Sequence, residues 1–165
     1  MFQLEAMLPL LILAFLGTPV VLTESKSSYH GLESGKHFCT SAPEGKNVTG
    51  IRAFVKGLAI ARIQLRFGQE WGKVYGGSGG NEAEVELENE NIVGVFGTTS
   101  AFVNQVILLT DLGRQILLGS FRGRDDYSSF PKKPIYVLKG VCGYYVPGGI
   151  KGIKFLWGTL DSTCS

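Results

Sequence analysis

Apolar side chains in this chain recur at every second position. Residues 59–67 (AIARIQLRF) carry an apolar side chain at each odd position, with Arg62, Gln64 and Arg66 between them. Residues 82–88 (EAEVELE) alternate glutamate with apolar side chains in the same way. A period of two is typical of a β-strand with one buried face and one mostly solvated face. The chain is therefore built from strands rather than helices.

Several other short stretches have strand-like composition, and glycine-containing turns separate them. They are residues 48–56, 92–96, 102–110, 115–118, 135–145 and 150–157. No stretch after the first 23 residues keeps an amphipathic helical pattern for three turns, and 23 glycines would weaken helices. The sequence predicts one all-β domain, and the pattern alone leaves a sandwich, a barrel or a prism open.

The first residues predict secretion. Met7–Leu16 (MLPLLILAFL) is an apolar run with the length of the hydrophobic region of a signal peptide. A membrane span needs about 20 apolar residues, so we expect no stable membrane insertion. We predict a signal peptide over residues 1–23, with cleavage between Leu22 and Ser28.

The three cysteines are Cys39, Cys142 and Cys164. Two of them should pair in an oxidising compartment. Cys39 and Cys142 each lie inside a strand-like run, which favours a bridge between them. Cys164 would then be free, capped or linked to a second chain in a dimer. Asn47 opens a glycosylation sequon, Asn-Val-Thr, which has meaning in a secreted chain.

Charge and motifs argue against several functional classes. The formal net charge is +2 and no basic run exceeds two residues, which is too little for nucleic-acid binding. His37 and Cys39 should face the same side of a strand, but this is a weak metal signal. Residues 76–80 are rich in glycine but lack the lysine and helix of a phosphate-binding loop. We expect no enzyme activity, cofactor or metal.

Four motifs in order resemble the jacalin-related lectins. They are residues 29–38 (YHGLESGKHF), 48–71 ending in GQEW, 109–119 (LTDLGRQILLG) and 149–157 (GIKGIKFLW). The resemblance covers residues 29–158 and leaves 159–165 as a short tail. It is greatest to the animal secretory branch, with its zymogen-granule lectins and demilune cell and parotid proteins. It implies a β-prism of three four-stranded antiparallel sheets.

The resemblance also implies a sugar site between two loops, 31–36 and 143–151. In such lectins a hexose contacts backbone amides and one aspartate carboxylate. Lys151 stands at the position of that aspartate. An ammonium only donates hydrogen bonds, so we expect weakened mannose binding. The remaining loop pair would either favour an acidic sugar, through the charge of Lys151, or be a degenerate site. The predicted carbohydrate-binding residues are Gly31, Gly35, Gly143, Tyr144, Tyr145, Gly148, Gly149 and Lys151.

Two charged surfaces suggest other ligands. Evenly spaced basic residues on two neighbouring strands predict either a polyanion-binding patch or an ordinary solvated face. They are Arg52, Lys56, Arg62 and Arg66. The glutamates between positions 82 and 90 would attract polyamines or calcium, or only keep a strand edge soluble.

The function expected from these features is that of a secreted lectin of exocrine fluids, binding glycans on mucins or microbes. The alternatives are a secreted interaction or signalling protein whose sugar site is lost, and a polyamine or polyanion binder.

Overall fold

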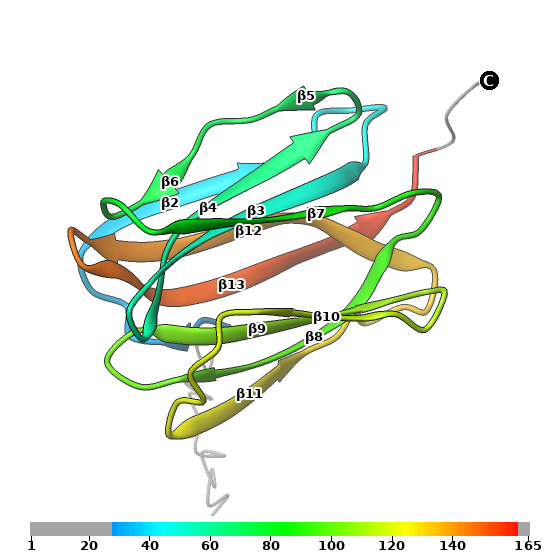
Figure 1. Cartoon of the computed structure of the whole chain (residues 1–165). Helices are drawn as coiled ribbons and strands as arrows, with labels where there is room; N and C mark the ends of the chain where they lie inside the picture. The colour runs from blue at the N-terminus through cyan, green and yellow to red at the C-terminus, as the bar shows by residue number, and fades with distance from the viewer. Residues whose placement is uncertain (1–27, 162–165) are drawn as a thin grey trace, which may run out of the picture.

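The computed structural model describes residues 28–161 and shows three antiparallel sheets arranged around one core (Figure 1). The predicted signal peptide and Cys164 lie outside these residues. Within residues 28–161 no helix is long and apolar enough to cross a membrane.

Each sheet is built mainly from hairpins. The first sheet has the order β1 (His30–Gly31), β13 (Gly149–Thr159), β12 (Tyr136–Val146), β2 (Lys36–Ser41). The second has the order β5 (Glu70–Trp71), β4 (Ala59–Phe67), β3 (Val48–Lys56), β7 (Asn81–Glu86), with β6 (Tyr75–Gly76) also on β4. The third has the order β10 (Gln115–Leu118), β9 (Val103–Thr110), β8 (Ile92–Thr99), β11 (Asp125–Ser129).

The predicted β-prism is confirmed, with one refinement in the second sheet. β5 and β6 pair with the same edge of β4, Trp71 opposite Arg66 and Tyr75 opposite Ile63. They are two parts of one edge strand, interrupted between Trp71 and Tyr75. The second sheet therefore has five labelled strands but four strand positions.

The core is filled by the inward-facing side chains of all three sheets. Ile51 and Leu65 of the second sheet, Val95 of the third and Val141 and Ile153 of the first are almost fully buried. Such burial of aliphatic side chains is the main favourable term in folding.

The alternation predicted for residues 59–67 is interrupted at one place. Ile60, expected on the solvated face, is 1% exposed. The cause is a bulge, because Arg62 pairs with Phe54 and Ile60 pairs with Val55, which leaves Ala61 as an extra residue. A bulge rotates the strand locally and turns three consecutive side chains inward.

Side-chain contacts join the sheets where their edges meet. The rings of Phe38 and Tyr75 stack between the first and second sheets, with centres 5.1 Å apart. Those of His30 and Tyr127 stack between the first and third sheets at 4.6 Å. Between the second and third sheets, Arg114 donates a hydrogen bond to the Glu86 carbonyl at 2.8 Å.

The predicted Cys39–Cys142 disulfide is confirmed. The two cysteines are directly opposite each other on β2 and β12. They are 103 residues apart in the sequence, so the bridge closes a long loop. The chain-entropy model assigns such a bridge about 5 kcal/mol of stability.

Candidate functional site

The candidate site is built on the hairpin of β12 and β13. Val146 pairs with Gly149, so only Pro147 and Gly148 form the turn. The predicted loop 143–151 is therefore mostly strand: 143–146 belong to β12 and 149–151 to β13. The hairpin itself is as expected, but its irregular part is much shorter.

Lys151 is the extra residue of a β-bulge in this hairpin. Tyr144 pairs with Gly152 and Tyr145 pairs with Ile150, which leaves Lys151 without an opposite residue. Bulges re-aim a side chain relative to the regular strand. The Lys151 ammonium lies 5.7 Å from the centre of the Phe102 ring, which belongs to the connection between β8 and β9. No carboxylate within residues 28–161 forms an ion pair with it.

The loop between β1 and β2 lies directly against this hairpin. The Leu32 amide donates to the Lys151 carbonyl at 2.9 Å. Gly31 and Gly35 have φ of +89° and +105°. A β-carbon would lie 2.4 Å from the Lys151 carbonyl oxygen at Gly31, and 2.3 Å from that of Tyr145 at Gly35. Both predicted glycines therefore allow loop and hairpin to pack backbone against backbone.

The two predicted tyrosines face opposite sides of the first sheet. Tyr145 turns toward Phe38 and packs on the core. Tyr144 lies on the outer face, with its ring centre 5.1 Å from that of Tyr29 and 4.9 Å from that of His37. Only Tyr144 is thus available to a ligand stacking on this face.

The outer-face cluster around Tyr144 includes residues that the sequence did not identify as ligand-binding. The Tyr29 hydroxyl and His37 Nε2 are 2.7 Å apart and share a hydrogen bond. The Lys154 ammonium lies 5.5 Å from the centre of the Tyr29 ring. Burial raises the pKa of Tyr29, and the nearby Tyr144 and Glu33 raise it further. The phenol remains protonated at neutral pH.

Two more connections reach the end of the prism that carries the hairpin turn. The Ser78 amide, between β6 and β7, donates to the Pro147 carbonyl at 3.1 Å. A β-carbon at Gly148 would lie 3.1 Å from the Phe102 ring. Phe102 was missed by the sequence reading, although a single large aromatic after the polar run 98–100 is a usable signal. Figure 1 shows these connections and the β12–β13 turn at the left end.

Two of the glycines predicted to bind carbohydrate are buried and do not line a surface. Gly143 is buried in the middle of β12, where a β-carbon would meet the Phe38 ring at 2.7 Å. Gly149 is buried at the start of β13 beside Ile60. The structure therefore brings together Gly31, Gly35, Gly148 and Lys151 near the tip, and leaves Tyr144 on the adjoining face.

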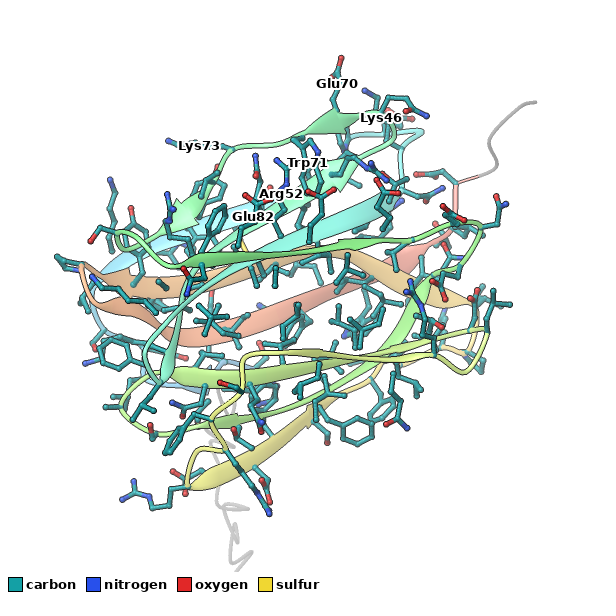
Figure 2. All side chains as sticks on the ribbon, in the orientation of Figure 1. Lys46, Arg52, Glu70, Trp71, Lys73 and Glu82 are labelled. Atoms are coloured by element: carbon teal, nitrogen blue, oxygen red, sulfur yellow. A yellow bond between two sulfur atoms is a disulfide. The ribbon has the colours of Figure 1, made fainter. Side chains whose placement is uncertain are left out.

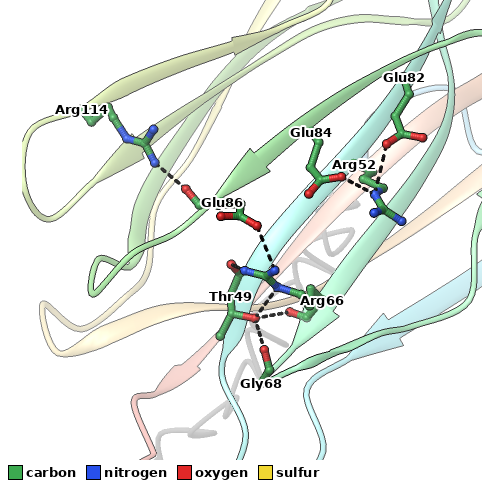
Figure 3. A network of polar contacts seen from close by, with 8 residues as sticks. All are labelled: Thr49, Arg52, Arg66, Gly68, Glu82, Glu84, Glu86 and Arg114. Carbon is green, nitrogen blue, oxygen red and sulfur yellow. Dashed lines mark hydrogen bonds and ion pairs between the residues drawn. The ribbon is translucent and has the colours of Figure 1, made fainter.

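Among the predicted basic residues, Arg52 lies on the second sheet with the acidic Glu82 beside it (Figure 2). Glu84 is directly opposite Arg52 on the neighbouring strand. Arg52 Nε lies 2.7 Å from the Glu84 carboxylate and 3.2 Å from that of Glu82. Arg66 pairs with Glu86 at 3.2 Å and donates to Thr49 (Figure 3).

Arg62 and Lys56, the other two residues of the predicted basic patch, have different contacts from those of Arg52 and Arg66. Arg62 donates to the Gly79 carbonyl at 3.1 Å and stacks on Phe54 at 4.2 Å. Lys56 is exposed at the end of β3 and has no ion-pair partner within residues 28–161. Arg52, Arg62 and Arg66 share one face as expected, but two of the three charges are compensated by β7.

The glutamates between positions 82 and 90 form ion pairs with different arginines. Glu90 is 8% exposed and forms an ion pair with Arg114. A hollow of about 560 Å³ opens beside it, lined by Glu86, Glu88, Glu90, Leu112 and Arg114. Glu88 has no ion-pair partner in the described part of the chain.

Asn47, the predicted glycosylation site, contacts the end of the described chain. Its side-chain amide donates to the Asp161 carbonyl at 3.0 Å and accepts from Lys139 Nζ at 3.1 Å. Lys139 also pairs with the Asp161 carboxylate at 2.8 Å and donates to the Lys46 carbonyl at 2.8 Å. Asn47 therefore helps to hold residue 161 against the sheet.

The structure gives no support to a metal site at His37. Cys39 is bonded to Cys142, so its thiolate is not available as a ligand. No cluster of three or more histidine, cysteine, aspartate or glutamate side chains suited to a metal occurs within residues 28–161.

Comparison with known proteins finds relatives along nearly the whole chain. Zymogen granule membrane protein 16 of Mus musculus is 30% identical over 145 residues, which cover 87% of this chain and 86% of the relative. Prostatic spermine-binding protein of Mus musculus is 31% identical over 159 residues, covering 94% and 77%. No family model matches the sequence.

Solved structures share the prism. A prostate-specific glycoprotein lectin, WGA16, superposes with a TM-score of 0.73 and 36% identity, covering 79% of this chain and 95% of that one. Malaysian banana lectin superposes with a TM-score of 0.66 at 19% identity, covering 80% and 96%, and shows the shared fold alone.

Proposed function

Because this chain belongs to the jacalin-related lectin family, we propose that it binds glycans through the loop 31–36 and the tip of the hairpin 143–151. The observation that supports this is the contact between them, in which the Leu32 amide donates to the Lys151 carbonyl. The contact holds the loop between β1 and β2 against the β-bulge of the hairpin at one end of the prism. The similar proteins are lectins and binding proteins, so we infer that the chain acts by binding.

We propose that the preferred ligand carries an acidic sugar. Lys151 stands where the resemblance to sugar-binding members implies an aspartate. A carboxylate accepts from two sugar hydroxyls, whereas an ammonium accepts from none. The Lys151 ammonium has no ion-pair partner within residues 28–161, and Tyr144 offers an aromatic ring on the adjoining face. A carboxylate or sulfate on a sugar would complement this charge.

A glycan array separates these possibilities. The wild-type protein is expected to bind sialylated or sulfated glycans, and Lys151→Ala is expected to lose that binding. Lys151→Asp is expected to gain mannose binding, because it restores the carboxylate. Lys73→Ala, an exposed lysine beside Tyr75 on the second sheet, is the matched control and should leave the profile unchanged.

The competing function is that of an interaction or signalling protein on a lectin scaffold. It predicts that neither the wild type nor Lys151→Asp binds any glycan. That result would overturn the glycan proposal. Mannose binding by Lys151→Asp without any wild-type binding would show an intact pocket and would reject only the acidic-sugar specificity.

Polyamine binding is a second candidate because one relative is named a spermine-binding protein. The hollow beside Glu86, Glu88 and Glu90 is the place that such a cation would occupy. Arg52, Arg66 and Arg114 already pair with glutamates of this stretch, which weakens the attraction. Calorimetry with spermine tests it, and loss of heat in Glu88→Gln would support binding at this hollow.

We further propose that the protein is secreted from exocrine cells and meets its glycans on mucins or microbes. The apolar run at residues 7–16 and the Cys39–Cys142 bridge are consistent with an oxidising secretory route. Expression in secreting cells, with sequencing of the mature N-terminus, tests the route. A non-reducing gel of Cys164→Ser beside the wild type tests the proposed disulfide-linked dimer.

A further inference from the structure

A second hollow lies at the far end of β13 from Lys151. β1 is only two residues long and pairs with Gly152 and Ile153. In the described chain the later part of this β13 edge has no strand beside it. A hollow of about 240 Å³ opens there, lined by Lys132, Tyr136, Phe155, Leu156 and Trp157. Trp157 is six positions from Lys151, or about 20 Å along a strand, so the hollow is separate from the glycan site.

The walls of this hollow are mostly apolar and offer few hydrogen bonds. Phe155, Leu156 and the ring of Trp157 supply carbon surface. The Trp157 indole N–H already donates to the Ser129 hydroxyl at 3.1 Å, which also holds the ring in place. A neutral sugar with several hydroxyls would leave most of them without partners, at a cost for each. A flat apolar group would instead stack on the Trp157 and Tyr136 rings.

The charge around the hollow is positive. Lys132 lines it and is exposed. Lys133 lies 5.5 Å from the centre of the Tyr136 ring. Neither lysine forms an ion pair within residues 28–161, and none of the five lining residues is acidic. An anionic group at the rim would therefore be attracted without displacing an existing partner.

We propose that this hollow binds a small aromatic anion, a fused ring pair bearing one carboxylate or sulfonate. The ring pair lies against Trp157 and Tyr136, and the acid group pairs with Lys132. The volume corresponds to about eight water molecules, which suits a ligand of this size rather than a larger one. Pockets that are apolar with a few placed polar groups are the usual form of small-molecule sites.

The test uses the fluorescence of Trp157. The chain has two tryptophans, so Trp71→Phe leaves Trp157 as the single one. In this background, naphthalene-2-sulfonate is expected to change the emission saturably at pH 7. The neutral analogue 2-naphthol is expected to bind about tenfold more weakly, because it carries no negative charge to form an ion pair with Lys132.

Two lysine variants identify the site. Lys132→Glu is expected to weaken naphthalene-2-sulfonate binding about tenfold or more. Lys73→Glu, at an exposed lysine beside the Tyr75 ring of the second sheet, should leave it unchanged. Circular dichroism checks that both variants remain folded. The proposal would be overturned if the emission did not change saturably in the protein with both lysines intact. It would also be overturned if the two variants lost affinity for naphthalene-2-sulfonate equally. Neither outcome bears on glycan binding at Lys151.

Discussion

The guanidinium of Arg52 lies 3.8 Å from the centre of the Trp71 ring. Trp71 is on β5 and Arg52 is on β3, so the two residues meet across β4. Arg52 Nε also pairs with Glu84 and Glu82 of β7. The arginine is thus held by residues from both edges of the second sheet, and its charge is largely used within the molecule.

This arrangement predicts how the protein responds to polyanions. The wild type should bind heparin weakly, because glutamates compensate Arg52 and Arg66. Replacing Glu82, Glu84 and Glu86 together by glutamine should free both guanidinium groups and delay elution from a heparin column to higher salt. Glu70→Gln, which removes an exposed partner of Lys46, is the control and should elute nearly as the wild type. Unchanged elution of the triple variant would refute a masked basic patch.

The packing of the first loop on the hairpin predicts unequal costs for three glycine substitutions. Gly31→Ala and Gly35→Ala should each lower the free energy of unfolding by about 2–4 kcal/mol, through positive φ and a backbone clash. Gly45→Ala has a φ of +74° but open space around it, so it should cost only about 1 kcal/mol. Urea denaturation measures the differences. Equal costs at all three positions would mean that the loop does not press on the hairpin.

Lys139 predicts a stability effect at the end of the described chain. Its ammonium contacts three oxygens, from Lys46, Asn47 and Asp161, and its side chain is 16% exposed. Lys139→Met should lower the free energy of unfolding by about 1–3 kcal/mol, because these acceptors lose a shared donor. Lys133→Met, at an exposed lysine, should change it little. Thermal and urea unfolding of both variants check this, and equal stabilities would count against the contact.

His30 predicts a dependence of stability on pH. Burial lowers the pKa of His30 below its ordinary value of 6.5. In the unfolded chain the imidazole takes up a proton near pH 6.5, while in the folded protein it resists protonation. The contribution of His30 is therefore complete above pH 6.5 and is lost as the pH falls below it.

Urea midpoints at pH 7.5 and 5.0 measure this effect. The midpoint should fall on acidification, and it should fall less in His30→Phe, which keeps a ring against Tyr127. Other acidic groups titrate in both proteins, so the difference between the two falls isolates His30. An identical fall in both proteins would show that His30 is protonated equally in the folded and unfolded states.

The strands could be read from the sequence where the period of two was clear. Residues 59–67 were expected as a strand and form β4 with those limits. The bulge at Ala61 could not be foreseen, because it depends on which residues of β3 lie opposite. The hairpin 143–157 was recognised, but its turn is only Pro147 and Gly148, because cross-strand pairing extends both strands.

For the charged surfaces, too, the sequence identified the residues but not their arrangement relative to one another. The sequence placed the arginines on one face and the glutamates at positions 82–86 on one face, as two separate candidate sites. The structure puts them on the same face, because β3 pairs with β4 on one side and with β7 on the other. Pairing between β3 and β7 joins residues about 30 positions apart, and no local pattern specifies that register.

The sequence by itself determined the all-β class and the positions of many strands and turns, because side-chain alternation and turn residues act locally. It favoured the Cys39–Cys142 pair because both cysteines lie in strand-like runs. Only the tertiary structure decided which charges neutralise one another, where Lys151 points and where β13 is left uncovered. Those features depend on the register of strands that are distant in the chain, and register is set when the sheets pack around a common core.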